Sequence, residues 1–464
     1  MKKRKYLVIL ICLMFFVLAG CTVVDPNNQA PSNPNDPDIN EPSNPGNENK
    51  DDKLIKNRNV ENFVSEQGEV PKIIIYTRDN VFPYDKENYV KGTLQIVEQP
   101  NEENVIFEEA PMGIRLRGNS TYECPKKPFR IKFDQKQSLF GLPKAKSWVL
   151  LANYYDKSQM RNYLAYLTAN KLDNLDFQPA SIFVEVEING EYQGLYLLCE
   201  QMETGTGRVD IEQDEYDQAN PTAFFELDFL DRILADGLVE NQSYFETHGY
   251  YFGLKYPDSD DITVAQCANI KRYVDRAFNK IFTAHNYDLV IDVDSFIDYY
   301  LINELFKNVD VVQTSVYFYL KDGMVFAGPV WDFDIGLGVV GKNEHSSVYE
   351  VYQRSTLWVK EYSRYYKALF SDVDFLNQVK ARYNEVRSLL AEVFDELKIA
   401  LDILQEELQR DVAKWGIPGE LYMWLSGEYC TEYRELKTYD EHIAYLKKQL
   451  NIQFINMDKE FLNK

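Results

Sequence analysis

Basic residues, closely spaced cysteines and long apolar segments are all scarce in this chain of 464 residues. Lys and Arg total 50 against 73 Asp and Glu, and the formal net charge is -23. Because proteins bind a nucleic-acid backbone mainly by neutralising its phosphates with cations, this charge argues against nucleic acid as a partner. No internal repeat is evident, and at roughly 150 residues per domain the length predicts two or three domains or one two-lobed unit.

The cysteines lack the pattern of a zinc site. After Cys21, four remain, at 124, 199, 267 and 430, and they are widely spaced without nearby His. One or two disulfides would suit an exported chain, whereas a buried free thiol is the simpler explanation for Cys199, which lies in an apolar strand pattern.

The first twenty residues have the pattern of an export signal. Basic residues at 2–5 precede an apolar run over 6–18, and small residues follow. This run is shorter than the ~20 apolar residues of a membrane-spanning helix, so residues 1–20 are predicted to be a signal peptide. The sequence Leu-Ala-Gly-Cys at 18–21 resembles the lipobox of bacterial lipoproteins, which implies acylation of Cys21 and anchoring to the outer face of a bacterial cell membrane.

Composition divides the rest of the chain into a tether and two lobes. Residues 21–57 are dominated by Asn, Pro, Asp and Ser, and such a segment stays disordered because hydrophobic burial cannot offset its conformational entropy. The folded part is predicted to begin near Arg58, with a β-rich N-lobe over 58–202 and a helix-rich C-lobe over 203–464. The predicted fold class is therefore α+β.

Alternating apolar residues predict strands in the N-lobe. The stretches 72–77 and 129–133 follow this pattern. A hairpin is predicted over 182–198, because Asn189-Gly190 supplies the positive φ angles of a tight turn. A helix is predicted over 156–173, with its first residue as the cap. The N-lobe is thus predicted to be a β-sheet that carries one helix.

The C-lobe is predicted to be mainly helical. Helices are expected over 263–284 and 294–306, before a strand pair that begins at 316–320. A long amphipathic run follows, in which apolar residues recur three, four or seven positions apart over 375–408. Core packing in a folded-back helical hairpin explains this run, and its length also permits a coiled-coil partner.

Three clusters carry residue types suited to chemistry, and the first is a polar loop followed by basic residues. In the loop over 115–121, Gly118 lets the backbone come close to a ligand, while hydroxyl and amide side chains offer hydrogen-bond donors. Lys side chains over 126–132 add mobile positive charge, so the cluster can hold phosphate. A polar turn that leads into a strand with a solvated basic face explains the same residues equally well.

The second cluster is the end of the helix at 294–306 together with Asp310. A carboxylate between this helix and the following strand can orient a hydroxyl nucleophile or accept its proton. An Asp just after a helix is also a common turn former, so this residue alone supports both interpretations.

The third cluster, Gly-Pro-Val-Trp-Asp-Phe-Asp at 328–334, is the most specific. Asp332 and Asp334 stand between an apolar strand and a glycine-rich turn, where both can face a hard cation that also binds substrate phosphates. Acidic residues beside Trp331 and Phe333 are costly to bury without a partner. A metal site is favoured over a capped turn in which the two Asp accept backbone amides.

Taken together, these motifs resemble the spore-coat CotH kinase family. The resemblance covers roughly residues 70–340 and rests on several motifs in the family's order. The motifs lie at 115–120 (RLRGNS), 126–133 (KKPFRIKF), 148–153 (WVLLAN), 186–196 (VEINGEYQGLY) and 328–334 (GPVWDFD). Membership would imply a two-lobed, atypical protein-kinase-like fold, with ATP and Mg²⁺ or Mn²⁺ bound between a β-rich N-lobe and a helical C-lobe.

The resemblance assigns nucleotide contacts to five residues. Arg117 and Lys127 would face the triphosphate, with Ser120 as a further donor in the same loop. Glu200 would lie near adenine, at the end of the strand that leads into the C-lobe, and Trp331 would wall the nucleotide pocket.

Three carboxylates would carry the chemistry in a member of this family. Asp310 would be the catalytic-loop acid that orients the acceptor hydroxyl, Asp332 would hold the metal, and Asp334 would be a second metal ligand or an orienting group. One position departs from the expected pattern, because Ser315 stands where kinases often place an Asn that binds a second metal. A hydroxyl is a weaker ligand than an amide oxygen, so either one metal suffices or activity is reduced.

The function implied by the resemblance is transfer of the γ-phosphoryl group of ATP to Ser or Thr of an exported or surface protein, a reaction that depends on positioning and charge neutralisation. Other classes stay open. A surface-anchored binding protein with a weak or inactive kinase-like fold would explain the tether, the 33 Tyr and Ser315. A metal-dependent glycosyltransferase would also use an Asp-x-Asp pair, whereas a glycosidase would need its carboxylates ~5 to 10 Å apart across a sugar.

Overall fold

The computed structural model describes residues 70–213, 215–341, 347–416 and 430–462. They all belong to one compact unit, which spans residues 46–464. The predicted signal peptide, the tether, Cys21 and the predicted start of the N-lobe at Arg58 lie outside the described residues. Within the described part, none of the helices combines the length and the apolar character that crossing a membrane requires.

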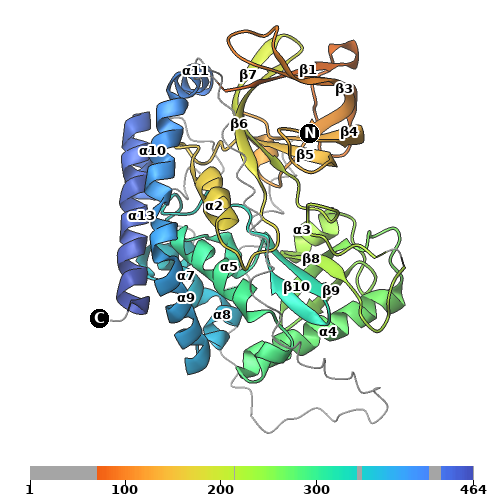
Figure 1. Ribbon diagram of the computed structural model, residues 1–464, viewed down its shortest axis with the longest axis vertical. Coiled ribbons are helices and arrows are strands. Elements are labelled where there is room, and N and C mark those ends of the chain that lie inside the picture. Colours follow the sequence, from red (N-terminus) through yellow and green to blue (C-terminus); the bar gives the residue numbers. More distant parts are fainter. Residues whose placement is uncertain (1–69, 214, 342–346, 417–429, 463–464) are drawn as a thin grey trace, which may run out of the picture. The chain divides into compact units, whose positions relative to one another are not determined.

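Seven strands of the N-terminal part form a closed barrel (Figure 1). In chain order they are β1 (Lys72–Thr77), β2 (Val90–Val97), β3 (Val105–Leu116), β4 (Phe129–Gln137), β5 (Ala145–Leu151), β6 (Ser181–Ile188) and β7 (Glu191–Glu200). Around the barrel their order is β1-β2-β3-β4-β5-β7-β6, and the parallel pair of β1 and β6 closes the ring. One buried core gathers alternating apolar residues of these strands, among them Ile73, Ile114, Phe129 and Trp148.

The strands predicted in the N-terminal part are confirmed, but the sheet they form closes on itself. β1 has the predicted bounds, and β6 and β7 form the predicted hairpin, with φ angles of 55° at Asn189 and 79° at Gly190. The closure was not predicted, because the pairing of Ile73 with Val186 joins strands that are distant in sequence and leaves no local pattern.

The predicted helix over 156–173 is shorter than expected. α2 spans Arg161–Asn170, and a turn precedes it. The Asp156 carboxylate accepts hydrogen bonds from the backbone amides of Ser158 (3.0 Å) and Arg161 (2.8 Å), and it pairs with the Arg161 guanidinium at 2.6 Å. Asp156 therefore organises this turn and does not cap a helix that begins beside it.

The C-terminal part contains a five-stranded sheet of order β12-β11-β8-β10-β9, which the sequence predicted only in part. The strands are β8 (Ala223–Asp228), β9 (Tyr244–Thr247), β10 (Tyr250–Tyr256), β11 (Val316–Lys321) and β12 (Met324–Ala327). β8, β9 and β10 were missed because much of both faces is buried and the apolar residues do not alternate. Phe225, Phe252 and Phe318 from three adjacent strands pack together, with ring centroids 5.7, 6.0 and 6.3 Å apart.

Helices make up much of the remaining C-terminal part. They are α3 (Leu230–Ala235), α4 (Val264–Thr283), α5 (Val293–Leu305), α6 (Ser347–Arg354), α7 (Trp358–Tyr362), α8 (Arg364–Leu369), α9 (Val373–Ala391), α10 (Val393–Ile403), α11 (Gln405–Trp415), α12 (Thr431–Glu435) and α13 (Tyr439–Phe461). Short 3-10 turns lie at η2 (Arg78–Asn80), η3 (Thr121–Glu123), η4 (Tyr287–Leu289) and η5 (Asp310–Val312). α4 and α5 confirm the helices predicted over 263–284 and 294–306.

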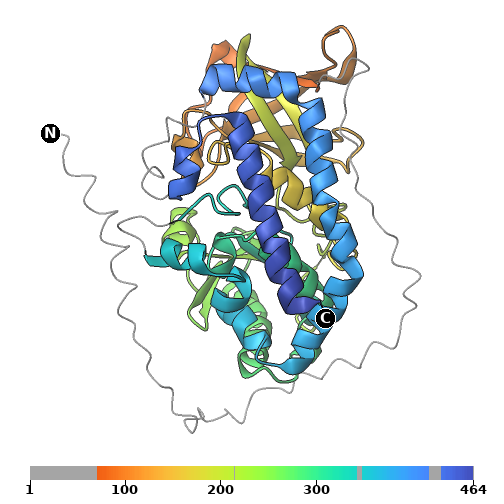
Figure 2. The same ribbon diagram turned by 90° about the vertical axis from the view of Figure 1, so that its left-hand side faces the viewer.

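The long amphipathic run forms three consecutive helices, α9, α10 and α11, and not a single hairpin. The chain breaks at Glu392 and Leu404, so that α11 lies against the barrel (Figure 2). There the Asp411 carboxylate accepts the backbone amide of Leu195 in β7 at 2.8 Å. α13 packs against α9 and α10 (Figure 1). The C-terminal helices therefore contact one another and the barrel.

The cysteines at 124, 199, 267 and 430 are all buried free thiols. This confirms the simpler explanation for Cys199, and no disulfide joins these four residues. Burial raises the pKa of Cys199 to about 12 and that of Cys124 and Cys267 to about 11, so these three thiols stay protonated near neutral pH.

Candidate active site

The candidate residues of the C-terminal part meet at one edge of the five-stranded sheet. β11 runs antiparallel to both β8 and β12, so the start of β11 lies beside the ends of its two neighbours. Asp228 ends β8, the loop over 310–315 leads into β11, and the segment over 328–334 leaves β12. The topology therefore gathers Asp228, Asp310 and Asp332 from three separate stretches of chain.

Hydrogen bonds join the two predicted motifs around Asp310 and Asp332. The Ser315 hydroxyl donates to Asp332 Oδ2 at 3.1 Å, and the Asn308 side-chain amide donates to the Trp331 carbonyl at 3.2 Å. Ser315 (φ 55°) and Asp332 (φ 65°) both adopt the left-handed backbone region, which is uncommon for non-glycine residues and tends to occur at functional sites. Ser315, which replaces the expected Asn, thus orients the carboxylate that the resemblance assigns to the metal.

The three predicted carboxylates share one electrostatic environment. Removal from water raises the pKa of Asp310, Asp332 and Asp334, and the charge of Asp332 raises it further at the other two. The Arg117 guanidinium opposes this and lowers the pKa of Asp332 and Asp334. The Arg232 guanidinium likewise lowers the pKa of Asp310 and Asp332. Such a group is suited to binding a cation or to proton transfer.

The barrel contributes Arg117, in the loop after β3. Its guanidinium lies over the Trp331 ring, 5.5 Å from the centroid. Trp331 in turn stacks on Tyr166 of α2, with centroids 5.5 Å apart and an angle of 11° between the planes. An Arg stacked on an aromatic ring keeps the edge of its guanidinium available for an anion. The structure thus brings Arg117 and Trp331 together with the carboxylates.

Two other predicted nucleotide contacts belong to the loop that follows Arg117. Ser120 directly precedes the turn η3, where its carbonyl accepts the backbone amide of Glu123 at 3.2 Å. The structure therefore places Ser120 in the same loop as Arg117, three residues later. Lys127 is turned back into its own loop, where Nζ donates to the Tyr122 carbonyl at 2.9 Å.

The side chains of Glu200 and Lys126 are taken up by buried ion pairs. Glu200, at the end of β7, pairs with Arg208 and accepts the Ala180 backbone amide at 2.9 Å. Lys126 pairs with Asp411 of α11 at 2.8 Å. In both pairs, removal of one partner would leave a buried charge. The pair of Lys126 joins the barrel to α11, and neither pair includes one of the three predicted carboxylates.

The start of α2 holds the segment that carries the two aspartates of the third motif. Asn162 Oδ1 accepts the backbone amide of Phe333 at 2.8 Å. Arg161 donates from Nε to the Gly336 carbonyl (3.0 Å) and from Nη2 to the Leu337 carbonyl (3.2 Å). The Arg-Asn pair at 161–162 therefore has a physical role, because it fixes this segment against the helix of the N-terminal part.

Three residues at this edge were not predicted from the sequence. The Thr314 hydroxyl donates to Asp228 Oδ1, and Arg232 Nη1 donates to Thr314 Oγ1 at 2.6 Å and to Asp228 Oδ1 at 3.3 Å. The available signal was an Asp after an apolar stretch with an Arg four residues later. It was overlooked because the sequence did not identify β8 as a strand.

Asp332 and Asp334 fit a divalent cation that also binds substrate. The described residues hold no group of three or more His, Cys, Asp or Glu that would bind a metal by themselves. However, Mg²⁺ and Mn²⁺ prefer carboxylate oxygens, and Mg²⁺ often uses one or two carboxylates plus phosphates and water. The negative charge of Asp332 raises the pKa of Asp334. A bound cation would relieve this repulsion between the two carboxylates.

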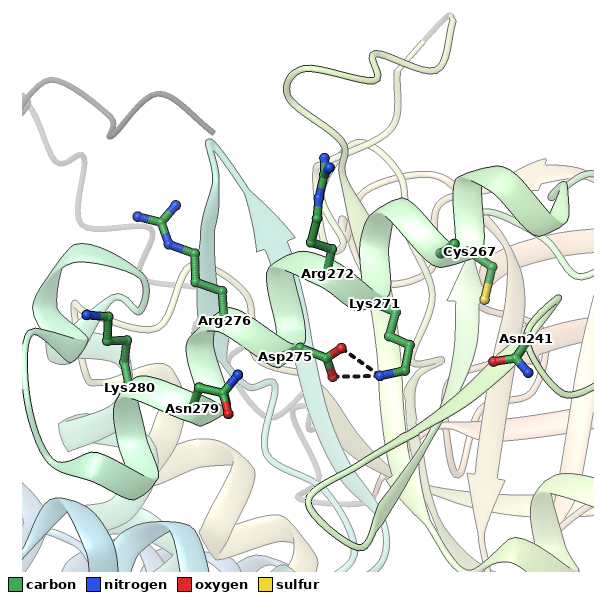
Figure 3. Close-up of a pocket in the computed structure, with 9 residues that line it drawn as sticks. Asn241, Cys267, Lys271, Arg272, Asp275, Arg276, Asn279 and Lys280 are labelled. Carbon is green, nitrogen blue, oxygen red and sulfur yellow. Dashed lines mark hydrogen bonds and ion pairs between the residues drawn. The ribbon is translucent and has the colours of Figure 1, made fainter. Parts of the chain in front are cut away.

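A hollow of about 490 Å³ lies along α4 (Figure 3). Its lining includes Lys271, Arg272, Arg276 and Lys280, and Lys271 pairs with Asp275 at 2.6 Å. The described residues that line it include no member of the predicted site. This basic hollow is therefore distinct from the group of carboxylates.

Comparison with known proteins bears on the same region. The chain matches the family model described as CotH kinase protein over residues 114–451, which is most of its length. No curated protein matches it. The matched stretch includes Arg117, Arg232 and the three predicted carboxylates, and it ends within α13.

Proposed function

Because the chain belongs to the CotH kinase family, we propose that it transfers the γ-phosphoryl group of ATP to Ser or Thr side chains of an exported or surface protein. The observation that supports this best is the meeting of Asp310, Asp332 and Asp334 with two guanidinium groups. Phosphoryl transfer requires carboxylates for the metal and the nucleophile, and cations for the phosphate charge. Both kinds of group are present here.

Asp310 would orient the acceptor hydroxyl and accept its proton. Removal from water and the charge of Asp332 hold the pKa of Asp310 above its ordinary value, which brings this carboxylate closer to the pH at which a general base works best. The backbone of the loop is fixed, because the Asp310 amide donates to Asn308 Oδ1 at 3.0 Å and its carbonyl accepts the Thr314 amide at 2.9 Å.

Arg117 and Trp331 would form the nucleotide side of the site. The planar guanidinium matches phosphate oxygens, and the indole offers an apolar wall. Ser120 would add a hydroxyl in the same loop. Lys127 would reach a phosphate only after releasing the Tyr122 carbonyl, and Glu200 would act by placing the end of β7, since its carboxylate is paired.

Asp332 and Asp334 would hold Mg²⁺ or Mn²⁺, which supplies neutralisation of phosphate charge when bound. The protein keeps these two carboxylates in place from both sides. Ser315 donates to Asp332, and Asn162 accepts the amide of Phe333, the residue between them.

The fold and the location would match this role. The barrel would serve as the N-lobe of a kinase-like fold, and the helices with their five-stranded sheet as its C-lobe. The chain would be a lipoprotein, anchored through Cys21 to the outer face of a bacterial cell membrane. Its acceptor would be a Ser- and Thr-rich protein, such as one resembling a spore-coat component.

Transfer of label from γ-labelled ATP tests this function. The protein lacking only residues 1–21, its Asp332→Ala variant and a matched Asp275→Ala variant on α4 are incubated with Mn²⁺ or Mg²⁺ and casein. We expect the unsubstituted protein and Asp275→Ala to label casein. Asp332→Ala should lose more than about a hundredfold in rate, because even outer-shell partners of metal ligands are worth about 10- to 100-fold.

The same experiment can overturn the proposal. If no label is transferred, and ATP with either metal does not raise the midpoint of thermal unfolding, the protein is not an ATP-dependent kinase. Equal labelling by the Asp332→Ala variant would support the kinase activity but show that Asp332 is not the metal ligand.

A further inference from the structure

A second guanidinium, that of Arg232, acts on Asp332 as Arg117 does, but it comes from a different element. Arg232 lies on α3, which begins shortly after Asp228 ends β8. Its positive charge acts on Asp310 and Asp332, whose pKa values it lowers. The site therefore receives one arginine from the barrel and one from the C-terminal part.

Arg232 is held in a defined position by its neighbours. Nη1 donates to Thr314 Oγ1 at 2.6 Å and to Asp228 Oδ1 at 3.3 Å, while the Thr314 hydroxyl donates to the same carboxylate oxygen. The backbone amide of Phe229 donates to Asp228 Oδ1 at 2.8 Å. The Phe229 ring also lies under the guanidinium, with Cζ 5.1 Å from its centroid. These contacts restrict the side chain.

Most hydrogen-bond donors of the Arg232 guanidinium are not used by the described residues. Its side chain is 30% exposed, and Nε and Nη2 donate no hydrogen bond to the part of the chain that the structure describes. A purely structural pair with Asp228 would be best served by two parallel bonds from the guanidinium fork. Here only one nitrogen is used, and Thr314 shares it.

We propose that Arg232 binds the phosphoryl group as it passes from ATP to the acceptor hydroxyl, and that Asp228 and Thr314 position it for that contact. This inference rests on the proposed function and adds a catalytic residue to it. A guanidinium suits the role because it is planar, always charged and able to bind two phosphate oxygens at once.

The charge changes of the reaction explain why a second arginine is useful. In the transfer, the acceptor oxygen forms a bond to the γ-phosphorus, and the bond from that phosphorus to the bridging oxygen of ADP breaks. ADP leaves with the electron pair, and the proton of the acceptor passes to Asp310. Negative charge stays on the outer phosphoryl oxygens throughout, and an arginine that meets it is worth about a thousandfold or more in rate.

A binding measurement with the whole protein separates this role from a structural one. The unsubstituted protein, Arg232→Gln and a matched Arg276→Gln variant on α4 are unfolded by heat with ADP and Mn²⁺, with and without orthovanadate. Vanadate serves as the stand-in for the transferring phosphoryl group. We expect ADP with Mn²⁺ to raise the unfolding midpoint similarly in all three, and vanadate to raise it further in every protein except Arg232→Gln.

The kinetics supply a second measurement. Arg232→Gln should lose about a thousandfold in kcat, with little change in the KM for ATP. Free guanidinium should restore part of the rate, whereas NaCl at the same ionic strength should not. Thr314→Val keeps the guanidinium but removes its anchor, and its vanadate shift should lie between those of the unsubstituted protein and Arg232→Gln.

Three results would overturn the inference. An equal vanadate shift in Arg232→Gln shows that this arginine does not meet the phosphoryl group. A smaller ADP shift in that variant, with an unchanged vanadate increment, assigns Arg232 to the nucleotide. Absence of any ADP shift in the unsubstituted protein overturns the proposed function as well, and this outcome is distinct from the other two.

Discussion

Replacing Glu304 by Gln is expected to change how the stability of the protein depends on pH. Glu304 lies near the end of α5 and is fully buried. Its carboxylate accepts the backbone amides of Val359 (3.3 Å) and Lys360 (2.9 Å) and the side-chain amide of Gln453 (3.2 Å). Burial nevertheless raises the pKa of Glu304 to about 7, because these hydrogen bonds only partly offset the loss of water.

The direction of the effect follows from proton binding. The folded protein holds the Glu304 proton more tightly than the unfolded chain, whose pKa is the ordinary 4.5. The stability from the protonated group is fully present below pH 4.5 and is lost as the pH rises through about 7. At about 1.4 kcal/mol for each pH unit in this interval, the loss is roughly 3 kcal/mol. A Gln side chain does not titrate, so the variant escapes this loss.

Urea unfolding at pH values from about 4.5 to 8 measures the difference. The free energy of unfolding of Glu304→Gln, minus that of the unsubstituted protein, should rise by roughly 3 kcal/mol across this range, because the other titrating groups cancel. Glu191→Gln, at the exposed start of β7, is the matched control for replacing a carboxylate by an amide at the surface. A constant difference for Glu304→Gln would refute the reasoning.

Two further substitutions test the scaffold of the site by urea unfolding. Asn162→Ala removes the acceptor of the buried Phe333 amide and should lower the free energy of unfolding by about 1 to 3 kcal/mol; an unchanged value would contradict the anchoring role. Lys126→Met leaves the Asp411 carboxylate without its cation and should cost about 3 to 5 kcal/mol. Lys127→Met, which loses only a bond to a carbonyl, should cost about 1 kcal/mol or less, and equal losses would show that the ion pair is unimportant.

The parts of the fold that depend on neighbouring residues could be predicted from the sequence. Strand alternation and the Asn189-Gly190 turn predict the β6–β7 hairpin, and α4 and α5 match the helices predicted over 263–284 and 294–306. The barrel closure and the strand β8 could not be predicted. The first depends on a pairing between distant strands. In the second, the consecutive residues Phe224 and Phe225 both pack against aromatic rings, so the alternation that identifies a strand is absent.

The candidate site shows the same division. Asp310, Asp332 and Trp331 stand in recognisable motifs, and the structure brings them together with Arg117. The partners of the charged side chains could not be predicted. A motif has the same sequence whether its charged residue binds a ligand or forms a buried ion pair. Glu200 shows this difficulty, since its partner Arg208 becomes visible only in three dimensions.

The ion pair between Lys126 and Asp411 has a practical consequence for the smallest piece of this chain that can work. Lys126 stands in the same basic stretch as the loop that carries Arg117, and its buried charge is balanced by a residue from α11. A fragment trimmed to the motif-bearing residues, ending near 340, would leave this buried cation of the barrel without its counter-charge. α11 therefore completes the balance of buried charge in the barrel, and expression boundaries should extend beyond it.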